Sequence, residues 1–299
     1  MKYLITGGSG QVGYDVVREL VLHDKNAEIV APSHADMDIT NREETISYIK
    51  SFNPDVIFHC AAYTNVDKAE SDVKSAYDIN VNGTSNITEG ASLVGAKLIY
   101  VSTDYVFDGT KCEPYKMDDE ARPINVYGQT KLLGEEVVRE YPKHFIARTS
   151  WVFGVSGNGN FVKTMVRLSE NHDKLRVVSD QVGSPTYSRD LAKLLIEMSE
   201  SEAYGTYPAN NEGYTSWCEF AKSIFEEYKK DVVVEGITTE EYNAVAPRPL
   251  NTCLDKSALD EAGFKRLPHW KDALKAYKID NEEYQKLKTE KQKNLRKEM

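Results

Sequence analysis

KYLITGGSGQVG, at residues 2–13, is the most informative segment for the fold, and the amphipathic segment Tyr14–Leu22 follows it. The apolar residues at its start predict a short buried strand, the glycines predict a tight turn, and the segment after them predicts a helix. Glycines let backbone N–H groups approach a pyrophosphate closely, and the N-terminus of a helix attracts anions. This strand, turn and helix therefore predict a dinucleotide site. Its predicted contacts are Gly7, Gly10, Gln11 and Val12.

Strands and helices alternate through the first half of the chain. Further strands are predicted at Glu28–Ala31, Val56–His59, Leu98–Ser102 and Phe145–Thr149, and further helices at Arg42–Phe52, Ser71–Val94 and Tyr127–Glu140. This alternation predicts an α/β fold with a Rossmann-type, doubly wound parallel sheet. Because the carboxyl ends of parallel strands meet at one edge, we expect the glycine turn, Ala61-Ala62-Tyr63 and Ser102-Thr103-Asp104 to converge on one crevice. Ala61, Ala62 and Tyr63 are predicted to contact the dinucleotide there.

The pattern changes after Trp151, where a glycine-rich loop precedes shorter helical and strand-like segments. We expect residues 1–150 to form the dinucleotide-binding domain and residues 151–279 to form mainly a smaller, interleaved α/β substrate domain. Gly205–Ala209 is expected to return to the main sheet. Residues 280–299 are almost wholly charged and predict a solvated helix or a frayed tail. The few apolar side chains of that tail are Tyr284, Leu287 and Leu295.

Composition excludes several classes of protein. The chain has 299 residues and a formal net charge of −10, which argues against a nucleic-acid-binding surface. Its four cysteines stand far apart, without the spacing of a zinc site, and are typical of reduced thiols. The residues before the glycine turn contain no signal-peptide core, and no run approaches the roughly 20 apolar residues of a membrane span. We therefore expect a soluble, cytoplasmic protein with no membrane partner and no metal.

Tyr127 and Lys131 are four residues apart and so share one face of the predicted helix. A free tyrosine has a pKa near 10, too high for an efficient acid–base group at neutral pH. An ammonium one turn away, together with the positive charge of an oxidised nicotinamide, would lower the pKa of Tyr127. Thr103, at the end of a predicted strand, would donate to a carbonyl oxygen. These three residues are the predicted catalytic group, and Tyr127 and Lys131 are also predicted to contact the cofactor.

The cofactor expected here is a nicotinamide dinucleotide, and the end of the second strand bears on its type. NAD enzymes carry an acid there that binds the ribose 2′-hydroxyl, whereas this chain carries Ser33 and His34, with no carboxylate before Asp36. Ser33 and His34 suit a 2′-phosphate, so NADPH is favoured and NADH is the alternative. Asp38 and Ile39 lie where the chain passes the adenine, although Asp38 could instead cap the helix that follows.

Other residues have a functional and a structural interpretation. Asp104 could bind a sugar hydroxyl or cap its loop. Trp151 could wall a sugar pocket or pack in the core. His59, within an apolar strand, is expected to be a core histidine, and Asn80 to hold backbone near the site. Lys163, Arg167 and Arg248 could meet a diphosphate, but each is more typical of a surface charge.

Longer motifs carry a family resemblance. They include Ser102-Thr103-Asp104-Tyr105-Val106-Phe107-Asp108-Gly109, Tyr127-Gly128-Gln129-Thr130-Lys131, Arg148-Thr149-Ser150-Trp151 and Asp180-Gln181-Val182-Gly183-Ser184-Pro185-Thr186. With the glycine turn, they resemble the dTDP-4-dehydrorhamnose reductase family of extended short-chain dehydrogenases/reductases. The resemblance covers nearly everything except the charged tail.

That resemblance implies NAD(P)H-dependent reduction of dTDP-4-dehydro-β-L-rhamnose to dTDP-L-rhamnose, the last step of a precursor pathway for surface polysaccharide. It also implies that Thr103, Tyr127 and Lys131 are catalytic, and that Val66, Asp104 and Trp151 shape the sugar site. A monomer or a homodimer is expected; some members dimerise through Mg²⁺ held partly by a carboxylate on the first helix, where Asp15 lies.

Two alternatives remain open. A sugar-nucleotide epimerase would use the same three catalytic residues without net consumption of cofactor. A regulatory subunit would keep the dinucleotide site without reduction. A dehydratase is disfavoured, because Tyr105 stands where such enzymes carry a second acid after the Thr-Asp pair.

Overall fold

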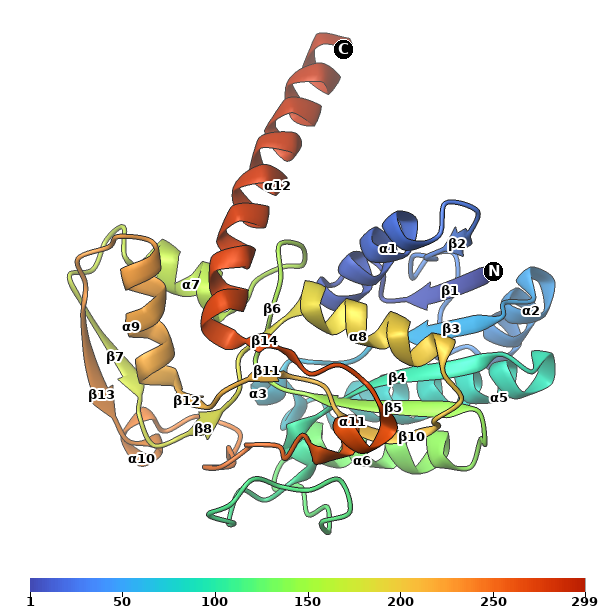
Figure 1. Cartoon of the computed structure of the whole chain (residues 1–299), viewed down its shortest axis with the longest axis horizontal. Helices are drawn as coiled ribbons and strands as arrows, with labels where there is room; N and C mark the ends of the chain where they lie inside the picture. Colours follow the sequence, from blue (N-terminus) through green and yellow to red (C-terminus); the bar gives the residue numbers. More distant parts are fainter. Residues whose placement is uncertain (299) are drawn as a thin grey trace.

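A six-stranded parallel sheet forms the centre of the molecule (Figure 1). The computed structural model describes residues 1–298, with side chains as far as residue 290. The strands lie in the order β10-β5-β4-β3-β1-β2. Their bounds are β1 Lys2–Thr6, β2 Glu28–Val30, β3 Val56–His59, β4 Lys97–Thr103, β5 His144–Thr149 and β10 Gly205–Pro208. The predicted doubly wound sheet is confirmed, including the return of β10, which pairs in parallel with β5.

Helices cover both faces of this sheet because successive strand residues point to opposite sides. Tyr3 and Ile5 pack against α1 and α8 on one face, whereas Leu4 belongs to the core on the other face. The helices of the first face are α1 Gln11–His23 and α8 Ser188–Glu200, and those of the second are α2 Arg42–Phe52, α5 Thr84–Val94 and α6 Val126–Arg139. Both faces of the strands are therefore buried, as their apolar sequences require.

The helix predicted over Ser71–Val94 is interrupted. The structure has α4 at Val73–Tyr77, a π-helical turn at Asp78–Gly83, and then α5. Within that turn the Asn80 side chain accepts a hydrogen bond from Tyr63 N (2.8 Å) and donates to Tyr63 O (3.2 Å). The expectation that Asn80 holds backbone near the site is confirmed. Unwinding to π geometry is a common way to place a side chain at a functional site.

A second core lies beside the carboxyl edge of the sheet, and we call the elements around it the small lobe. It consists of short strand pairs and the helices packed on them, with Phe153, Phe220 and Tyr277 among its buried side chains. The paired strands are β6 Val152–Phe153 with β9 Thr186–Tyr187, β7 Lys174–Val178 with β13 Val233–Ile237, and β8 Val182–Gly183 with β12 Thr215–Ser216. Its helices are α7 Phe161–Leu168 and α9 Trp217–Glu227.

The remaining elements connect these two parts. They are α3 Val66–Ala69, a 3-10 turn at Asp104–Val106, α10 Thr239–Tyr242, α11 Ser257–Ala262, and the pair β11 Asn211–Glu212 with β14 Leu267–His269. The last helix, α12, runs over Trp270–Glu298 and projects away from the body (Figure 1). Its first turns bury Trp270, Leu274 and Tyr277, whereas Leu287 is exposed. The side chain of Leu295 lies outside the described residues.

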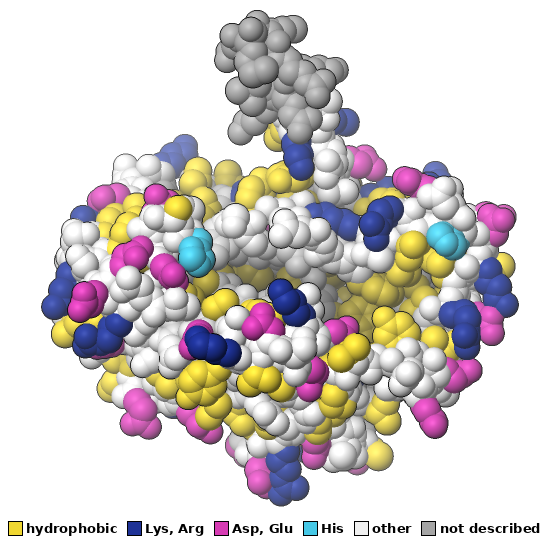
Figure 2. Space-filling view, turned by 180° about the vertical axis from the view of Figure 1, so that it is seen from behind, with side chains coloured by type: hydrophobic (Ala, Val, Ile, Leu, Met, Phe, Trp, Pro, Cys, Tyr) yellow, Lys and Arg dark blue, Asp and Glu magenta, His cyan; other side chains and the backbone are white. Residues whose placement is uncertain are grey.

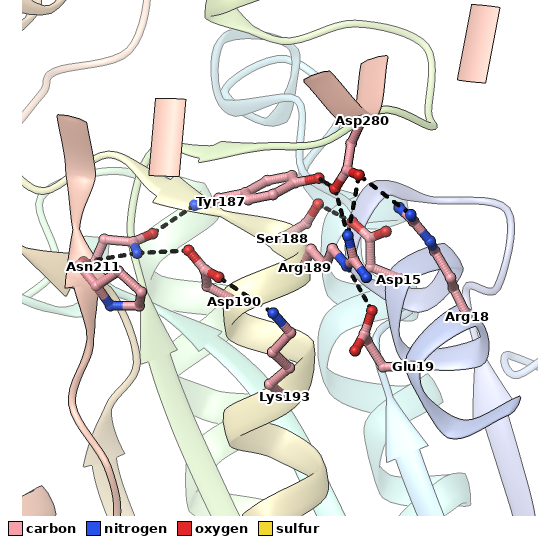
Figure 3. A network of polar contacts seen from close by, with 11 residues as sticks. Asp15, Arg18, Glu19, Tyr187, Ser188, Arg189, Asp190, Lys193, Asn211 and Asp280 are labelled. Atoms are coloured by element: carbon pink, nitrogen blue, oxygen red, sulfur yellow. Dashed lines mark hydrogen bonds and ion pairs between the residues drawn. The ribbon is translucent and has the colours of Figure 1, made fainter. Parts of the chain in front are cut away.

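A network of charged and polar side chains ties α12 to α1 and α8 (Figure 3). Arg189 on α8 contacts Asp280 (2.9 Å) and Glu19 (2.6 Å), and Arg18 also reaches Asp280 (3.3 Å). Asp280 is buried, although the sequence suggested that the solvated tail begins there. The Asp280 carboxylate can be buried because two arginines and the Tyr187 hydroxyl surround it.

Candidate functional site

One cavity of about 810 Å³ runs along the carboxyl edge of the sheet, between the sheet and the small lobe. On the face opposite that of Figure 1, the surface is hollowed and hydrophobic side chains gather in the hollow (Figure 2). The predicted site residues that line the cavity are Gly7, Gly10, Gln11, Val12, Ser33, His34, Asp38, Ile39, Ala61, Ala62, Val66, Thr103, Asp104, Tyr127, Lys131 and Trp151. Tyr63 is not among the lining residues, because its backbone is bound to Asn80 and its hydroxyl to Asp72.

The glycine turn brings strand β1 and helix α1 too close together for side chains. A Cβ on Gly13 would lie 2.3 Å from Gly7 O, and Gly7 itself has a φ of +68°. In the described part of the chain no side chain caps the N-terminus of α1. Its first N–H groups therefore face the cavity unpaired by side chains, which suits the pyrophosphate of a dinucleotide.

Gln11, a predicted cofactor contact, lines the cavity, and its side chain also binds the small lobe. It accepts hydrogen bonds from Gly154 N (2.7 Å) and Asn160 Nδ2 (2.8 Å), both in the loop between β6 and α7 of the small lobe. Its backbone remains part of the glycine turn. The cofactor turn and the small lobe are thus joined directly by one side chain.

The far end of the cavity carries the residues that bear on cofactor type. The Ser33 backbone and hydroxyl both donate to Asp36 (2.9 and 2.6 Å), whereas the His34 side chain is 85% exposed and 3.7 Å from Asp38. His34 is therefore accessible to a phosphate. Asp38 does not cap α2, since it accepts from Thr40 and the N-cap is Asn41.

At the other end of the cavity, Thr103, Tyr127 and Lys131 lie together. Thr103 ends β4, and Tyr127 and Lys131 occupy successive turns of α6, which packs against that strand. Lys131 Nζ donates to Val101 O (2.8 Å) and lies 4.0 Å from the centre of the Tyr100 ring. Burial lowers the pKa of Lys131 to about 7. The lysine is fixed by the protein rather than by solvent.

The predicted lowering of the Tyr127 pKa concerns the protein with an oxidised nicotinamide bound, and burial shifts this pKa the other way in the protein alone. Burial raises the pKa of Tyr127 to about 12, although a hydrogen bond with Thr103 opposes that rise. Lys131 does not offset this burial in the protein alone, where its ammonium donates to Val101 O. Tyr127 is therefore a neutral phenol that holds a proton at neutral pH.

Sequence reasoning missed a fully buried ion pair beneath these residues. Arg148 on β5 donates to both carboxylate oxygens of Glu135 on α6, at 3.0 and 2.8 Å. The Ser102 hydroxyl also donates to Glu135 (2.6 Å), so its proton is used within the protein core. Burial alone would raise the pKa of Glu135, but these hydrogen bonds lower it. Tyr127, Lys131 and Glu135 are spaced four residues apart and so share one helix face. This spacing was the signal in the sequence that could have identified Glu135.

Asp104 is buried next to the catalytic group. It accepts from the Thr103 hydroxyl (3.0 Å), its other carboxylate oxygen has no hydrogen-bond partner in the described residues, and only 2% of the residue is exposed. Burial raises the pKa of Asp104 to about 7. A carboxyl that is partly protonated at neutral pH can donate a hydrogen bond as well as accept one.

We expect the Asp104→Asn variant to change the pH dependence of stability. Between about pH 4 and pH 7 the folded protein retains a proton that the unfolded chain has released, so stability falls as pH rises through this window. The amide carries no such proton, and the variant should gain up to about 4 kcal/mol relative to the wild type above the window. Urea unfolding of both proteins at about pH 4 and about pH 8 measures this. The exposed Asp118→Asn is the matched control; parallel curves for Asp104→Asn and wild type would contradict the expectation.

Trp151 forms one wall of the cavity, and its partner there was not foreseen. The Trp151 backbone has a φ of +48°, a conformation that costs about 1–3 kcal/mol for a residue other than glycine. Its ring stacks on Trp217, with centroids 3.6 Å apart. Trp217 also lines the cavity. Trp151 lies between β5 and β6, and Trp217 begins α9, so no local pattern in the sequence predicts that their rings touch.

The other candidates take structural roles. His59 is buried between the Thr6 and Thr84 hydroxyls (2.7 and 3.1 Å), and burial lowers its pKa to about 3, which confirms a core histidine. Arg248 pairs with Asp67 (2.9 Å), and Lys163 donates to Val155 O and Ser156 O.

No metal site or membrane span is evident in the described chain. Asp15 is buried and accepts from the Ser188 hydroxyl. The side chains of residues 1–290 include no group of three or more His, Cys, Asp or Glu placed to hold a metal ion. No helix in the same range is both long and apolar enough to cross a membrane.

Comparisons with known proteins agree with one another. The family model described as the RmlD substrate binding domain matches residues 1–282. The dTDP-4-dehydrorhamnose reductase of Aggregatibacter actinomycetemcomitans is 43% identical over 287 residues, covering 92% of this chain and 97% of that protein. The spore coat polysaccharide biosynthesis protein SpsK of Bacillus subtilis is 40% identical over 277 residues, covering 92% and 96%. The structure of Bacillus anthracis dTDP-4-dehydrorhamnose reductase in complex with NADP superposes with a TM-score of 0.90 at 41% identity, covering 93% of this chain and 99% of that one.

Proposed function

The chain belongs to the dTDP-4-dehydrorhamnose reductase family, and from this premise we propose how its cavity performs the reaction. The protein is an NAD(P)H-dependent oxidoreductase that reduces the 4-keto group of dTDP-4-dehydro-β-L-rhamnose to give dTDP-L-rhamnose. The observation that supports the assignment of residues is the layout of one cavity. The glycine turn and the uncapped N-terminus of α1 line one part of this cavity, and Thr103, Tyr127 and Lys131 line another.

The residues present fit a dinucleotide. The backbone of Gly7–Gly13 would hold the pyrophosphate, His34 and Ser33 would meet the 2′-phosphate of NADPH, and Lys131 and Tyr127 would contact the nicotinamide ribose. Asp38, Ile39, Ala61 and Ala62 would line the adenosine and ribose portions. When bound, the reduced nicotinamide supplies the hydride that converts the keto carbon into an alcohol.

Tyr127 is the proposed proton donor. As the keto carbon is reduced, its oxygen develops the charge of an alkoxide, which is a stronger base than a phenolate. Because burial keeps the Tyr127 phenol protonated in the protein alone, the proton is present when that charge develops. Lys131, one turn away, stabilises the phenolate that remains. The Thr103 hydroxyl, which donates to Asp104 in the protein alone, would turn to donate to the same substrate oxygen.

Three further residues would hold the sugar. Trp151 would pack against the face of the ring, Val66 on α3 would contact its apolar edge, and Asp104 would hydrogen-bond a hydroxyl. Asp104 lies beside Thr103, so it would hold a hydroxyl close to the reacting carbon. Each of these three side chains lines the same cavity as Tyr127.

The direct test mixes the purified protein with freshly generated dTDP-4-dehydrorhamnose and either NADPH or NADH, and follows nicotinamide absorbance. We expect stoichiometric loss of the reduced cofactor, formation of dTDP-L-rhamnose, and a higher kcat/KM with NADPH. Product formation without cofactor loss would instead indicate an epimerase. Cofactor binding with no turnover of any keto sugar would indicate a regulatory subunit. A cytoplasmic monomer or homodimer without nucleic-acid or metal partners is part of the same proposal.

A further inference from the structure

Trp151 is held in an unfavourable backbone conformation by its surroundings. A φ of +48° is rare for a bulky residue, and such strain persists only where neighbouring groups impose it. The backbone of Trp151 is tied by one hydrogen bond from Thr186 N to Trp151 O (3.2 Å). The position of its indole must then be determined by the side chains that it touches.

Two elements of the small lobe contact this indole. A Cβ on Gly183 would lie 2.9 Å from Trp151 Cε2, so only glycine allows β8 to approach the ring so closely. Trp217, the first residue of α9, stacks on it with an interplanar angle of 11°. The antiparallel pairing of β8 with β12, which leads directly into α9, brings Gly183 and Trp217 to the same ring.

Trp217 also contacts a residue of the small lobe other than Trp151. Its ring packs on Phe161 at the start of α7, with centroids 4.6 Å apart. Asn160, the N-cap of α7, donates to Gln11 Oε1 (2.8 Å) in the glycine turn. A continuous series of contacts therefore runs from the cofactor turn through Asn160, Phe161 and Trp217 to Trp151.

We propose that Trp217 is a positioning residue for the sugar nucleotide: by stacking on Trp151 it holds that indole as the wall of the sugar site. The proposal rests on the proposed function, in which Trp151 packs against the sugar. Without Trp217, Trp151 loses the flat surface opposing it, and its strained backbone can relax away from the cavity. Binding of the sugar weakens, whereas Tyr127, Thr103 and Lys131 on the sheet side are unaffected.

The test compares Trp217→Ala and Trp217→Phe with wild type in steady-state kinetics and circular dichroism. The chain has three tryptophans, and two stacked indoles whose transition dipoles are rotated relative to each other give a coupled circular dichroism signal that a single indole cannot. We expect Trp217→Ala to lose this signal and to raise KM for the sugar nucleotide about tenfold, with kcat and the Kd of NADPH within about twofold. Trp217→Phe, which folds with an aromatic ring in place, should give an intermediate KM. Trp270→Phe, which replaces a tryptophan of the small-lobe core, should keep both signal and KM.

A double variant separates positioning from direct contact. If Trp217 acts through Trp151, then Trp151→Ala with Trp217→Ala should have the KM of Trp151→Ala alone, within about twofold. Additive effects would overturn the proposal, because Trp217 would then contact the sugar independently. Loss of the coupled signal with wild-type KM would overturn it as well, and so would loss of NADPH binding. Failure of the proposed function is distinguishable from these results, since wild type itself would then not oxidise NADPH with this substrate.

Discussion

Tyr127→Phe is expected to lower kcat by about a thousandfold while the Kd of NADPH stays close to that of wild type. The variant keeps the aromatic ring and its packing, including the edge-on contact with Tyr105 at 5.9 Å, and removes only the hydroxyl. No other group is placed to give a proton as directly, because Lys131 is directed at Val101 O and Thr103 is a far weaker acid. Single-turnover kinetics with saturating cofactor measures the chemical step, and titration of cofactor fluorescence measures binding.

Tyr207→Phe is the matched control for this prediction. Its hydroxyl donates to Ala203 O (2.7 Å) in the main core, outside the cavity lining, so kcat should not change. Retention of wild-type turnover by Tyr127→Phe would show that another group donates the proton. Asp104 would then be the next candidate, because burial raises its pKa to about 7 and leaves a proton available at neutral pH.

Arg148→Ala should cost about 3–5 kcal/mol of unfolding free energy, the largest effect on stability that we expect. Arg148 and Glu135 are both fully buried and joined by two hydrogen bonds. Removing the guanidinium leaves the buried Glu135 carboxylate with only the Ser102 hydroxyl and the partly exposed Arg139. It also removes the contact of Arg148 with the Phe107 ring. Urea unfolding followed by circular dichroism gives the difference between variant and wild type.

Arg139→Ala provides a control that acts on the same carboxylate. Arg139 also pairs with Glu135, but its side chain is 36% exposed, so its loss should cost less than about 1 kcal/mol. Equal losses for the two arginines would contradict the argument from burial. Replacing both partners, in Glu135→Leu with Arg148→Met, should recover most of the stability, because no buried charge is left unpaired.

Local patterns in the chain were enough to predict the architecture and much of the site. Each strand of the main sheet and the glycine turn follow from patterns within about ten residues, where side-chain periodicity and glycine geometry act directly. Parallel topology then placed Thr103, Ala61 and the glycine turn at one edge, as the cavity lining confirms. Tyr127 and Lys131 were found because helical spacing is itself a local property.

The environment of those residues could not be predicted, because it comes from the packing of distant segments. Three features depend on which distant segments pack together. They are the effect of burial on the Tyr127 pKa, the pairing of Glu135 with Arg148, and the break of a helix at Asn80. Trp217 meets Trp151 because two short strands pair between them. The physical reason is that periodicity and turn preference act over neighbouring residues, whereas desolvation and side-chain contact depend on the whole packed chain.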